Sequence, residues 1–257
     1  MDLQLEGKKV IVTASTSGIG LATARKFLEE GACVLINGRN EMKARAKKEL
    51  LEAEFGFGRV FLYTGDVTRE ENIRKLRQYA EEIWNRVDCI VANVGSGRPI
   101  SENRLESTEW EKGFDINLFS AVTLVREFDN MWREGGSIVM LSSLAACDCI
   151  KAPYAYAAAK EGIRVFAKYL SDDYASRGIR VNCVLPGNVL FPGGRWEELL
   201  QQDKKEVEHY IQEKVPMKRF AIPEEIANAI VFLASGAASF ITGTSILIDG
   251  GQKRGIS

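Results

Sequence analysis

Short apolar runs alternate with longer amphipathic stretches along the whole chain. The runs are rich in Val, Ile and Leu without strict alternation, which predicts strands buried on both faces of a sheet. We expect these strands at residues 9–13, 33–37, 60–63, 89–92, 137–141, 181–185 and 245–248.

The stretches between these runs have the spacing of helices that bury one face. We expect helices at residues 19–30, 41–54, 69–85, 105–132, 154–176 and 223–234. Repeated strand–helix–strand units predict parallel strands joined by right-handed crossovers. The expected fold is α/β, a Rossmann-type doubly wound parallel sheet of about seven strands with helices on both faces, in one domain spanning residues 1–257.

One segment interrupts this rhythm. Residues 187–215 begin with PGNVLFPGG and continue as a charged amphipathic stretch, WEELLQQDKKEVEHYIQEK, which predicts one helix. Because the segment follows a strand at the carboxyl edge of the sheet, we expect it to form a substrate lid.

The amino-acid composition limits the kinds of binding partner that we expect. The 257 residues contain 34 Lys and Arg against 35 Asp and Glu, a formal charge of -1, so neither nucleic acid nor a membrane surface is expected as a partner. Five scattered cysteines favour a reduced, cytoplasmic protein, and no ligand-spaced cluster predicts a metal site. The start of the sequence lacks signal-peptide features. Polar residues within the uncharged stretch 226–248 argue against a membrane span.

A glycine-rich turn follows the first expected strand. The sequence TASTSGIG precedes a helix, where small residues let backbone amides approach a pyrophosphate. A plain structural turn is the alternative. The candidate cofactor residues here are Thr13, Ser15, Thr16, Ser17, Gly18, Ile19 and Gly20.

The end of the second strand bears on the choice of dinucleotide. It reads Asn37-Gly38-Arg39-Asn40, without the carboxylate that would bind the ribose of NAD. Arg39 offers a planar guanidinium for a 2′-phosphate. NADP(H) is therefore favoured and NAD(H) is the alternative, as is a solvated Arg39 with Asn40 capping the next helix.

Four polar residues form the candidate catalytic set. Tyr156 and Lys160 are four residues apart on an expected helix, so they share one face, although a surface pair is the alternative. The Lys160 ammonium and a cationic nicotinamide should lower the tyrosine pKa toward the working range. Ser143 closes an expected strand at the ligand-binding edge. Asn117 lies in an apolar helix where a buried amide needs a partner.

With these motifs in one order over the whole chain, the sequence resembles the single-domain branch of the short-chain dehydrogenase/reductase family. Other motifs shared with the family are Asp66-Val67, Ala92-Asn93-Val94-Gly95, Pro186-Gly187 and the ending Ile241-Thr242-Gly243…Asp249-Gly250-Gly251.

The resemblance implies a role for each candidate. Tyr156 would protonate the carbonyl oxygen, and Ser143 would hydrogen-bond it. Lys160 would lower the Tyr156 pKa and hold the nicotinamide ribose, while Asn117 would support a proton path to Lys160. The further cofactor residues implied are Asp66 and Val67 at the adenine, Asn93 at the adenosine ribose, and Gly95, Pro186, Gly187 and Val189.

Three positions depart from the family pattern. Ala14 replaces the usual first glycine of the turn, Ala92 replaces an asparagine, and Phe191 replaces a threonine that contacts the nicotinamide carboxamide. We expect the alanine at 14 to be tolerated. The ring of Phe191 is expected to shape the substrate pocket instead.

The leading hypothesis is an NAD(P)-dependent oxidoreductase that interconverts a small-molecule ketone and secondary alcohol. A 3-oxoacyl thioester is the first substrate class, with the acyl group carrier-bound if Arg98, Arg195, Lys204 and Lys205 form a basic entrance. A sugar or polyol dehydrogenase is the alternative, and an inactive dinucleotide-binding sensor is a weaker one. Residues 95–100, 145–153 and 187–215 should set the substrate. The family implies a homotetramer assembled through 105–132, 154–176 and the last strand.

Overall fold

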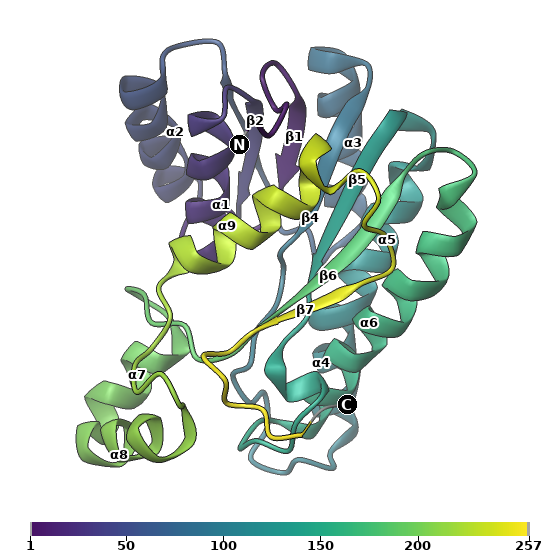
Figure 1. Ribbon diagram of the computed structural model, residues 1–257. Helices are drawn as coiled ribbons and strands as arrows, with labels where there is room; N and C mark the ends of the chain where they lie inside the picture. Colours follow the sequence, from purple (N-terminus) through teal and green to yellow (C-terminus); the bar gives the residue numbers. More distant parts are fainter. Residues whose placement is uncertain (1, 256–257) are drawn as a thin grey trace.

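All the strands belong to one parallel sheet. The computed structural model describes residues 2–255, and the sheet order is β3-β2-β1-β4-β5-β6-β7 (Figure 1). The strands are β1 (Lys9–Val12), β2 (Cys33–Gly38), β3 (Val60–Thr64), β4 (Val87–Ala92), β5 (Trp132–Leu141), β6 (Arg180–Pro186) and β7 (Ser245–Ile248). The order reverses direction at β1, which makes this a doubly wound Rossmann-type sheet, as predicted.

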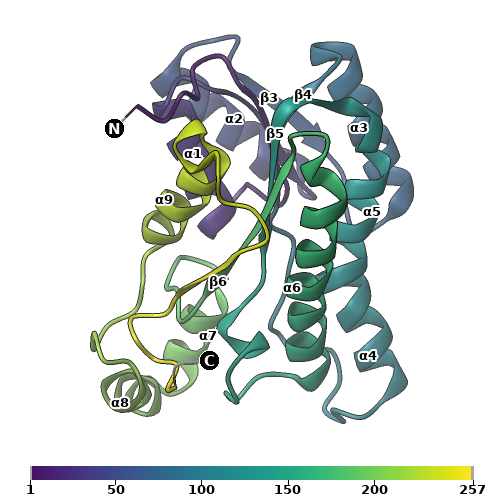
Figure 2. The same ribbon diagram turned by 45° about the vertical axis from the view of Figure 1, so that its right-hand side comes forward.

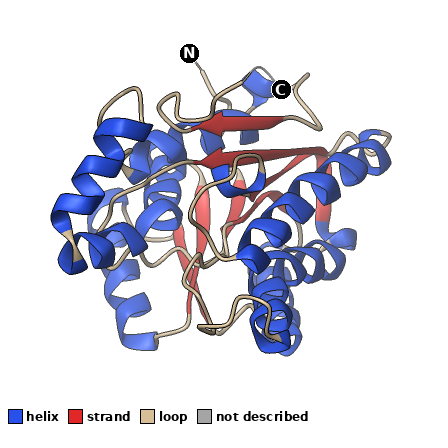
Figure 3. Ribbon diagram, turned by 90° about the horizontal axis from the view of Figure 1, so that it is seen from below, coloured by secondary structure: helices blue, strands red, loops and turns tan. Residues whose placement is uncertain are grey.

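Helices cover both faces of the sheet, so it is seen edge-on between two helical layers in Figure 3. One layer contains α1 (Gly18–Glu29), α2 (Glu41–Phe55) and α9 (Pro223–Ala234). The other contains α3 (Glu70–Trp84), α4 (Ser107–Phe114), α5 (Ser120–Glu127) and α6 (Tyr154–Ala175). The expected helices at 19–30, 41–54, 69–85, 154–176 and 223–234 are confirmed to within two residues at each end.

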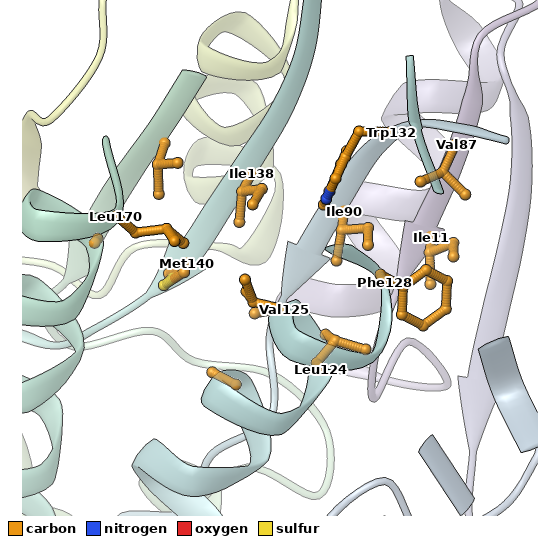
Figure 4. Close-up of a cluster of buried hydrophobic side chains, with 14 of the residues drawn as sticks. Ile11, Val87, Ile90, Leu124, Val125, Phe128, Trp132, Ile138, Met140 and Leu170 are labelled. Carbon is orange, nitrogen blue, oxygen red and sulfur yellow. The ribbon is translucent and has the colours of Figure 1, made fainter. Parts of the chain in front are cut away.

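Successive residues of a strand point into two hydrophobic cores, one on each face of the sheet. This explains why apolar and polar residues do not alternate along the strands. Ile11, Ile90 and Ile138 pack with Phe128 beneath the α3–α5–α6 layer (Figure 4). Their neighbours along the strands, such as Val10 and Val12, pack with Phe27 under α1 and α9. Because both faces are buried, the central strands must be apolar throughout. The edge strand β7 differs from the expectation, since none of its residues is fully buried.

The expected single helix at 105–132 is wrong. The structure divides it into α4, a π-helical turn at Asp115–Phe119, α5, and a short 3-10 turn, and Trp132 already begins β5. A π-helical turn holds one residue more than an α-helical turn, and such turns are frequent at functional sites. The apolar spacing of the sequence did not reveal this extra residue.

The expected continuous helix within 187–215 is also wrong. It divides at Asp203 into α7 (Arg195–Gln202) and α8 (Lys204–Lys214). The Asp203 carboxylate accepts a hydrogen bond from the Glu206 amide at 2.9 Å, which caps the second helix. Both helices project beyond the carboxyl ends of the strands, as Figure 2 shows beside α9.

No helix within the described residues is long and apolar enough to cross a membrane. Over the same residues, no three His, Cys, Asp or Glu side chains gather as they would around a metal ion.

Candidate active site

The helix α6 carries Tyr156 in its first turn and Lys160 one turn later, so the two side chains share a face. The Lys160 ammonium nitrogen lies 6.0 Å from the centre of the Tyr156 ring. Ser143 stands at the end of β5 and caps the following short turn by accepting the Ala145 amide at 3.2 Å. The Ser142 hydroxyl donates to the Lys160 carbonyl at 2.7 Å, which ties α6 to the end of β5.

Lys160 is 3% exposed, and its ammonium lies between the ends of two neighbouring strands. It donates to the carbonyl oxygen of Leu141 at 2.8 Å and to that of Val94 at 3.3 Å. Burial lowers the pKa of Lys160 to about 8, because the low-dielectric interior disfavours the charged form. The Lys160 ammonium therefore loses its proton more readily than that of an exposed lysine, but it remains the predominant form at pH 7.

Asn117 lies in the π-helical turn and is buried. Its side-chain oxygen accepts the Ser96 amide at 2.8 Å, and its side-chain nitrogen donates to the Gly113 carbonyl at 2.9 Å. Gly95 separates Asn117 from Lys160: a Cβ there would stand 2.7 Å from the lysine nitrogen and 3.1 Å from the asparagine oxygen. Only glycine lets the chain after β4 pass so close to both groups.

The pKa of Tyr156 departs from the expected direction. Burial raises it, and a hydrogen bond with Ser143 opposes the rise without cancelling it. Desolvation is the larger of these two effects. The phenol is therefore protonated at neutral pH, which suits a group that gives a proton away. The expected lowering by Lys160 together with a cationic nicotinamide stays a prediction.

A cavity of about 810 Å³ opens in front of Ser143 and Tyr156. Its walls come from three stretches: 97–109 after β4, 143–156 after β5, and 187–210 after β6. All three of the predicted substrate-determining loops contribute to it. The sequence analysis missed the wall formed by Glu102, Arg104 and Glu109, because a helix was expected to begin at residue 105.

The glycine-rich turn follows β1 and leads into α1. The Ser15 hydroxyl donates to the Val12 carbonyl at 2.7 Å, and the Thr13 hydroxyl donates to the Val91 carbonyl at 3.2 Å. These two predicted cofactor residues are buried and shape the turn with their side chains. Asn93 supports the turn from β4, because its amide donates to the Thr13 carbonyl at 3.0 Å.

The start of α1 fits the phosphates of a dinucleotide. Within residues 2–255, the backbone amides of Gly18, Ile19 and Gly20 have no backbone acceptor outside the helix, and the Ser17 side chain makes no cap. Unpaired amides at a helix N-terminus attract anions, both by hydrogen bonding and through the helix dipole. The residues present therefore fit the pyrophosphate group.

The end of β2 lies beside this turn. A Cβ on Gly38 would stand 2.4 Å from Thr16, so the threonine side chain lies against the strand end that leads to the exposed Arg39. Asn40 accepts the Lys43 amide at 2.9 Å and caps α2, as the alternative interpretation expected. Arg39 is exposed, as that interpretation also expected, and its guanidinium is available to a phosphate.

The other predicted cofactor residues surround the same edge. Asp66 accepts the Thr68 amide at 3.1 Å, and Val67 is buried beside Thr13 in a small cavity. At the end of β6, Gly187 passes so close to the C-terminal segment that a Cβ would stand 2.9 Å from Asp249. Val189 is buried and pairs with Ala221 through an isolated bridge.

Phe191 does not line the cavity, contrary to the expectation. Its ring lies against Gly18, where an added Cβ would be only 2.6 Å from a ring carbon, and also against Gly194. The ring therefore packs between the glycine-rich turn and the start of α7. The exposed side chain of His209 and the free thiols of Cys147 and Cys149 do not line the cavity either.

Comparison with known proteins identifies the family that shares this fold and site. Residues 13–253 match a family model described as "Enoyl-(Acyl carrier protein) reductase". A glucose 1-dehydrogenase from Gluconobacter oxydans is 35% identical over 251 residues, which cover 95% of this chain and 91% of the relative. The chain belongs to the short-chain dehydrogenase/reductase family. The resemblance drawn from the sequence motifs is thereby confirmed.

Other members of the short-chain dehydrogenase/reductase family are equally similar over their full length. A 3-oxoacyl-(acyl-carrier-protein) reductase from Chlamydia pneumoniae is 33% identical, with 98% of this chain and 99% of the relative covered. The crystal structure of L-sorbose reductase from Gluconobacter frateurii, complexed with NADPH and L-sorbose, has a TM-score of 0.92 at 30% identity and full coverage of both chains. These relatives are dehydrogenases and reductases, and this chain is an oxidoreductase of the same family.

Proposed function

We propose that this protein is an NADP(H)-dependent oxidoreductase that interconverts a ketone and a secondary alcohol. The observation that carries the proposal is the placement of Ser143 and Tyr156 in one cavity wall, with Lys160 buried behind the tyrosine. Support for NADP(H) comes from Arg39 at the end of β2 and from the NADPH complex of L-sorbose reductase.

The proposed mechanism assigns one task to each residue. When bound, the reduced nicotinamide supplies the hydride. Tyr156 donates its proton to the carbonyl oxygen, and Ser143 donates a hydrogen bond to the same oxygen as negative charge develops there. Lys160 keeps a positive charge beside the phenolate that remains. Asn117 holds the Ser96 backbone and so fixes the chain against which Lys160 packs.

Of the two substrate classes, the entrance favours a free small molecule over a carrier-bound acyl group. Arg98 and Arg195 both pair with Glu198, and Lys204 pairs with Glu208 at 3.6 Å. Two carboxylates thus offset part of the charge of Arg98, Arg195 and Lys204, which weakens the basic patch that an acidic carrier protein would need. Polar cavity residues such as Asn188 and Gln202 suit a hydroxylated substrate, which supports a sugar or polyol.

The test is a substrate panel with a matched variant. Purified protein is incubated with NADPH or NADH and with sugar ketoses, simple ketones or 3-oxoacyl thioesters, and oxidation of the cofactor is followed by absorbance. Tyr156→Phe should reduce turnover by roughly 10²- to 10⁴-fold, since a positioned acid contributes about that much. Its affinity for NADPH should stay within about twofold, because the substitution removes a single hydroxyl and keeps the ring that fills the site. Equal losses of turnover and cofactor binding would contradict the assigned role.

We also propose that the protein forms a homotetramer and acts in the cytoplasm. Large apolar side chains at Phe119, Val165 and Tyr169 are half or more exposed along the π-helical turn and α6, where the family expectation puts a subunit interface. Sedimentation velocity tests the assembly state. The cytoplasmic location stays a prediction from the thiol usage.

A further inference from the structure

The first helix of the lid segment, residues 187–215, is only partly buried. None of the residues of α7 is fully buried, although α8 buries Val207 and Ile211. Trp196 of α7 stacks on Tyr210 of α8 at 5.4 Å, which joins the two lid helices to each other. Trp196 also contacts Phe220, outside the lid segment, at 5.4 Å. The position of α7 over the cavity therefore depends on these ring contacts together with polar contacts to the rest of the molecule.

A single arginine supplies the tightest of these contacts. The Arg98 guanidinium, from the chain after β4, donates from Nε to the Glu198 carboxylate at 2.9 and 3.1 Å. Its Nη2 donates to the same carboxylate and also to the Gly193 carbonyl at 2.9 Å. The guanidinium thus binds the lid at two places, one on α7 and one just before it, in the planar forked geometry that arginine favours.

The chain that carries Arg98 is fixed on both sides of it. The Ser96 amide donates to Asn117 at 2.8 Å, and the amides of Ile100 and Ser101 each donate to Glu109 at 2.7 Å. Glu109 is 2% exposed, so this second attachment is buried. Arg98 is therefore a fixed point on the body of the protein to which the lid attaches.

This fixed point adjoins the reacting groups. Gly97, next to Arg98, faces the Tyr156 ring, since a Cβ there would stand 3.6 Å from the ring carbon that bears the hydroxyl. A second ion pair between body and lid, Lys151–Glu206, spans 3.5 Å, but its side chains are 89% and 67% exposed. Such an exposed pair contributes little, whereas the side chains of Arg98 and Glu198 are 45% and 36% exposed and share three hydrogen bonds. The Arg98–Glu198 pair thus joins the lid to the wall that contains the catalytic tyrosine.

On the basis of the proposed function, we infer that the Arg98–Glu198 ion pair holds α7 closed over the cavity and sets how tightly the carbonyl substrate is retained. Arg98 and Glu198 are positioning residues in this assignment, because they act through the lid. Substrate enters and product leaves when the pair separates. Weakening the pair should therefore raise the KM for the carbonyl substrate, while the proton and hydride steps keep their geometry.

The test compares Arg98→Gln, Glu198→Gln and the double variant with wild type. Each single variant should raise the KM for the carbonyl substrate severalfold, up to about fivefold. The kcat should be unchanged or higher, and the KM for NADPH should stay within about twofold. The double variant should raise the KM by less than the product of the two single effects, because each single variant already removes the Arg98–Glu198 contact. Additive effects, or a fall in kcat at unchanged KM, overturn the inference.

A matched control is available in Arg25→Gln. Arg25 makes a similar two-pronged pair with Glu54, at 2.5 and 2.6 Å and with similar exposure, but it joins α1 to α2 away from the cavity. This control should leave the KM for the carbonyl substrate unchanged. If it raises the KM as much as Glu198→Gln does, a general loss of stability explains both and the inference fails.

Amide hydrogen exchange gives a readout that needs no substrate. Glu198→Gln should increase exchange in peptides covering residues 190–203 relative to wild type, with little change in α6. If wild type reduces no carbonyl on the panel but Glu198→Gln still shows the increased exchange, the proposed function fails and the structural role of the ion pair stands. Unchanged exchange in 190–203 overturns the inference directly.

Discussion

Replacing Ala14 by glycine should stabilise the protein at the glycine-rich turn, because this residue has a positive φ angle. Its φ of 50° lies in the left-handed region, which costs an L-residue with a Cβ roughly 1–2 kcal/mol. Glycine avoids this cost but adds about 0.4–1 kcal/mol of unfolded-chain entropy. Ala14→Gly should therefore stabilise the fold by about 0.5–1 kcal/mol. The exposed methyl buries no surface, and both backbone hydrogen bonds of the residue, to Asn37 and from Asn93, remain available to glycine.

The assay is thermal and urea unfolding of wild type, Ala14→Gly and Ala46→Gly. For a chain of this size the expected gain corresponds to a rise in Tm of roughly 1–4 °C. Ala46 is also exposed but lies inside the regular helix α2, where glycine should destabilise by about 0.5–1 kcal/mol. The same substitution should thus move Tm in opposite directions at the two sites. A fall in Tm for both variants would refute the conformational argument.

Two further predictions concern the cofactor and the buried lysine. Arg39→Ala should weaken NADPH binding at least about tenfold and NADH binding less than about twofold, because only NADPH has a 2′-phosphate. Fluorescence titration measures both affinities. Equal losses for the two cofactors would contradict the NADP(H) preference. Burial lowers the pKa of Lys160 to about 8 from 10.5, so between these values the unfolded chain binds more protons and stability rises with pH. Between pH 7 and pH 9 this residue should add about 1 kcal/mol to the free energy of unfolding. Urea titrations of Lys160→Met should lack this gain. The same dependence of unfolding free energy on pH in both proteins would show that Lys160 is not the group responsible.

The sheet and most helices could be predicted because buried parallel strands impose a strong apolar pattern. Tyr156 and Lys160 could be placed on one face from their spacing alone, and Ser143 from its position at the end of a strand. These inferences use local periodicity and one rule about strand ends. They therefore do not require knowledge of distant contacts.

The remaining features depend on contacts between distant residues. Arg98 and Glu198 are 100 residues apart, and no local pattern marks them as partners. The direction of the Tyr156 pKa shift depends on how deeply the ring is buried, which spacing does not reveal. Phe191 could be recognised as a departure from the family pattern, but its contact with Gly18 required the path of the chain after β6.

The π-helical turn at Asp115–Phe119 makes this part of the chain sensitive to length as well as to side-chain identity. Deleting one residue there would convert the wide turn into ordinary α-helix, because five residues of π-helix turn the chain through nearly the same angle as four residues of α-helix. The deletion would give a more regular helix, yet Asn117 would no longer face the Ser96 amide that it now holds at 2.8 Å. Insertions and deletions at this turn should therefore be tolerated far less than point substitutions on its exposed side.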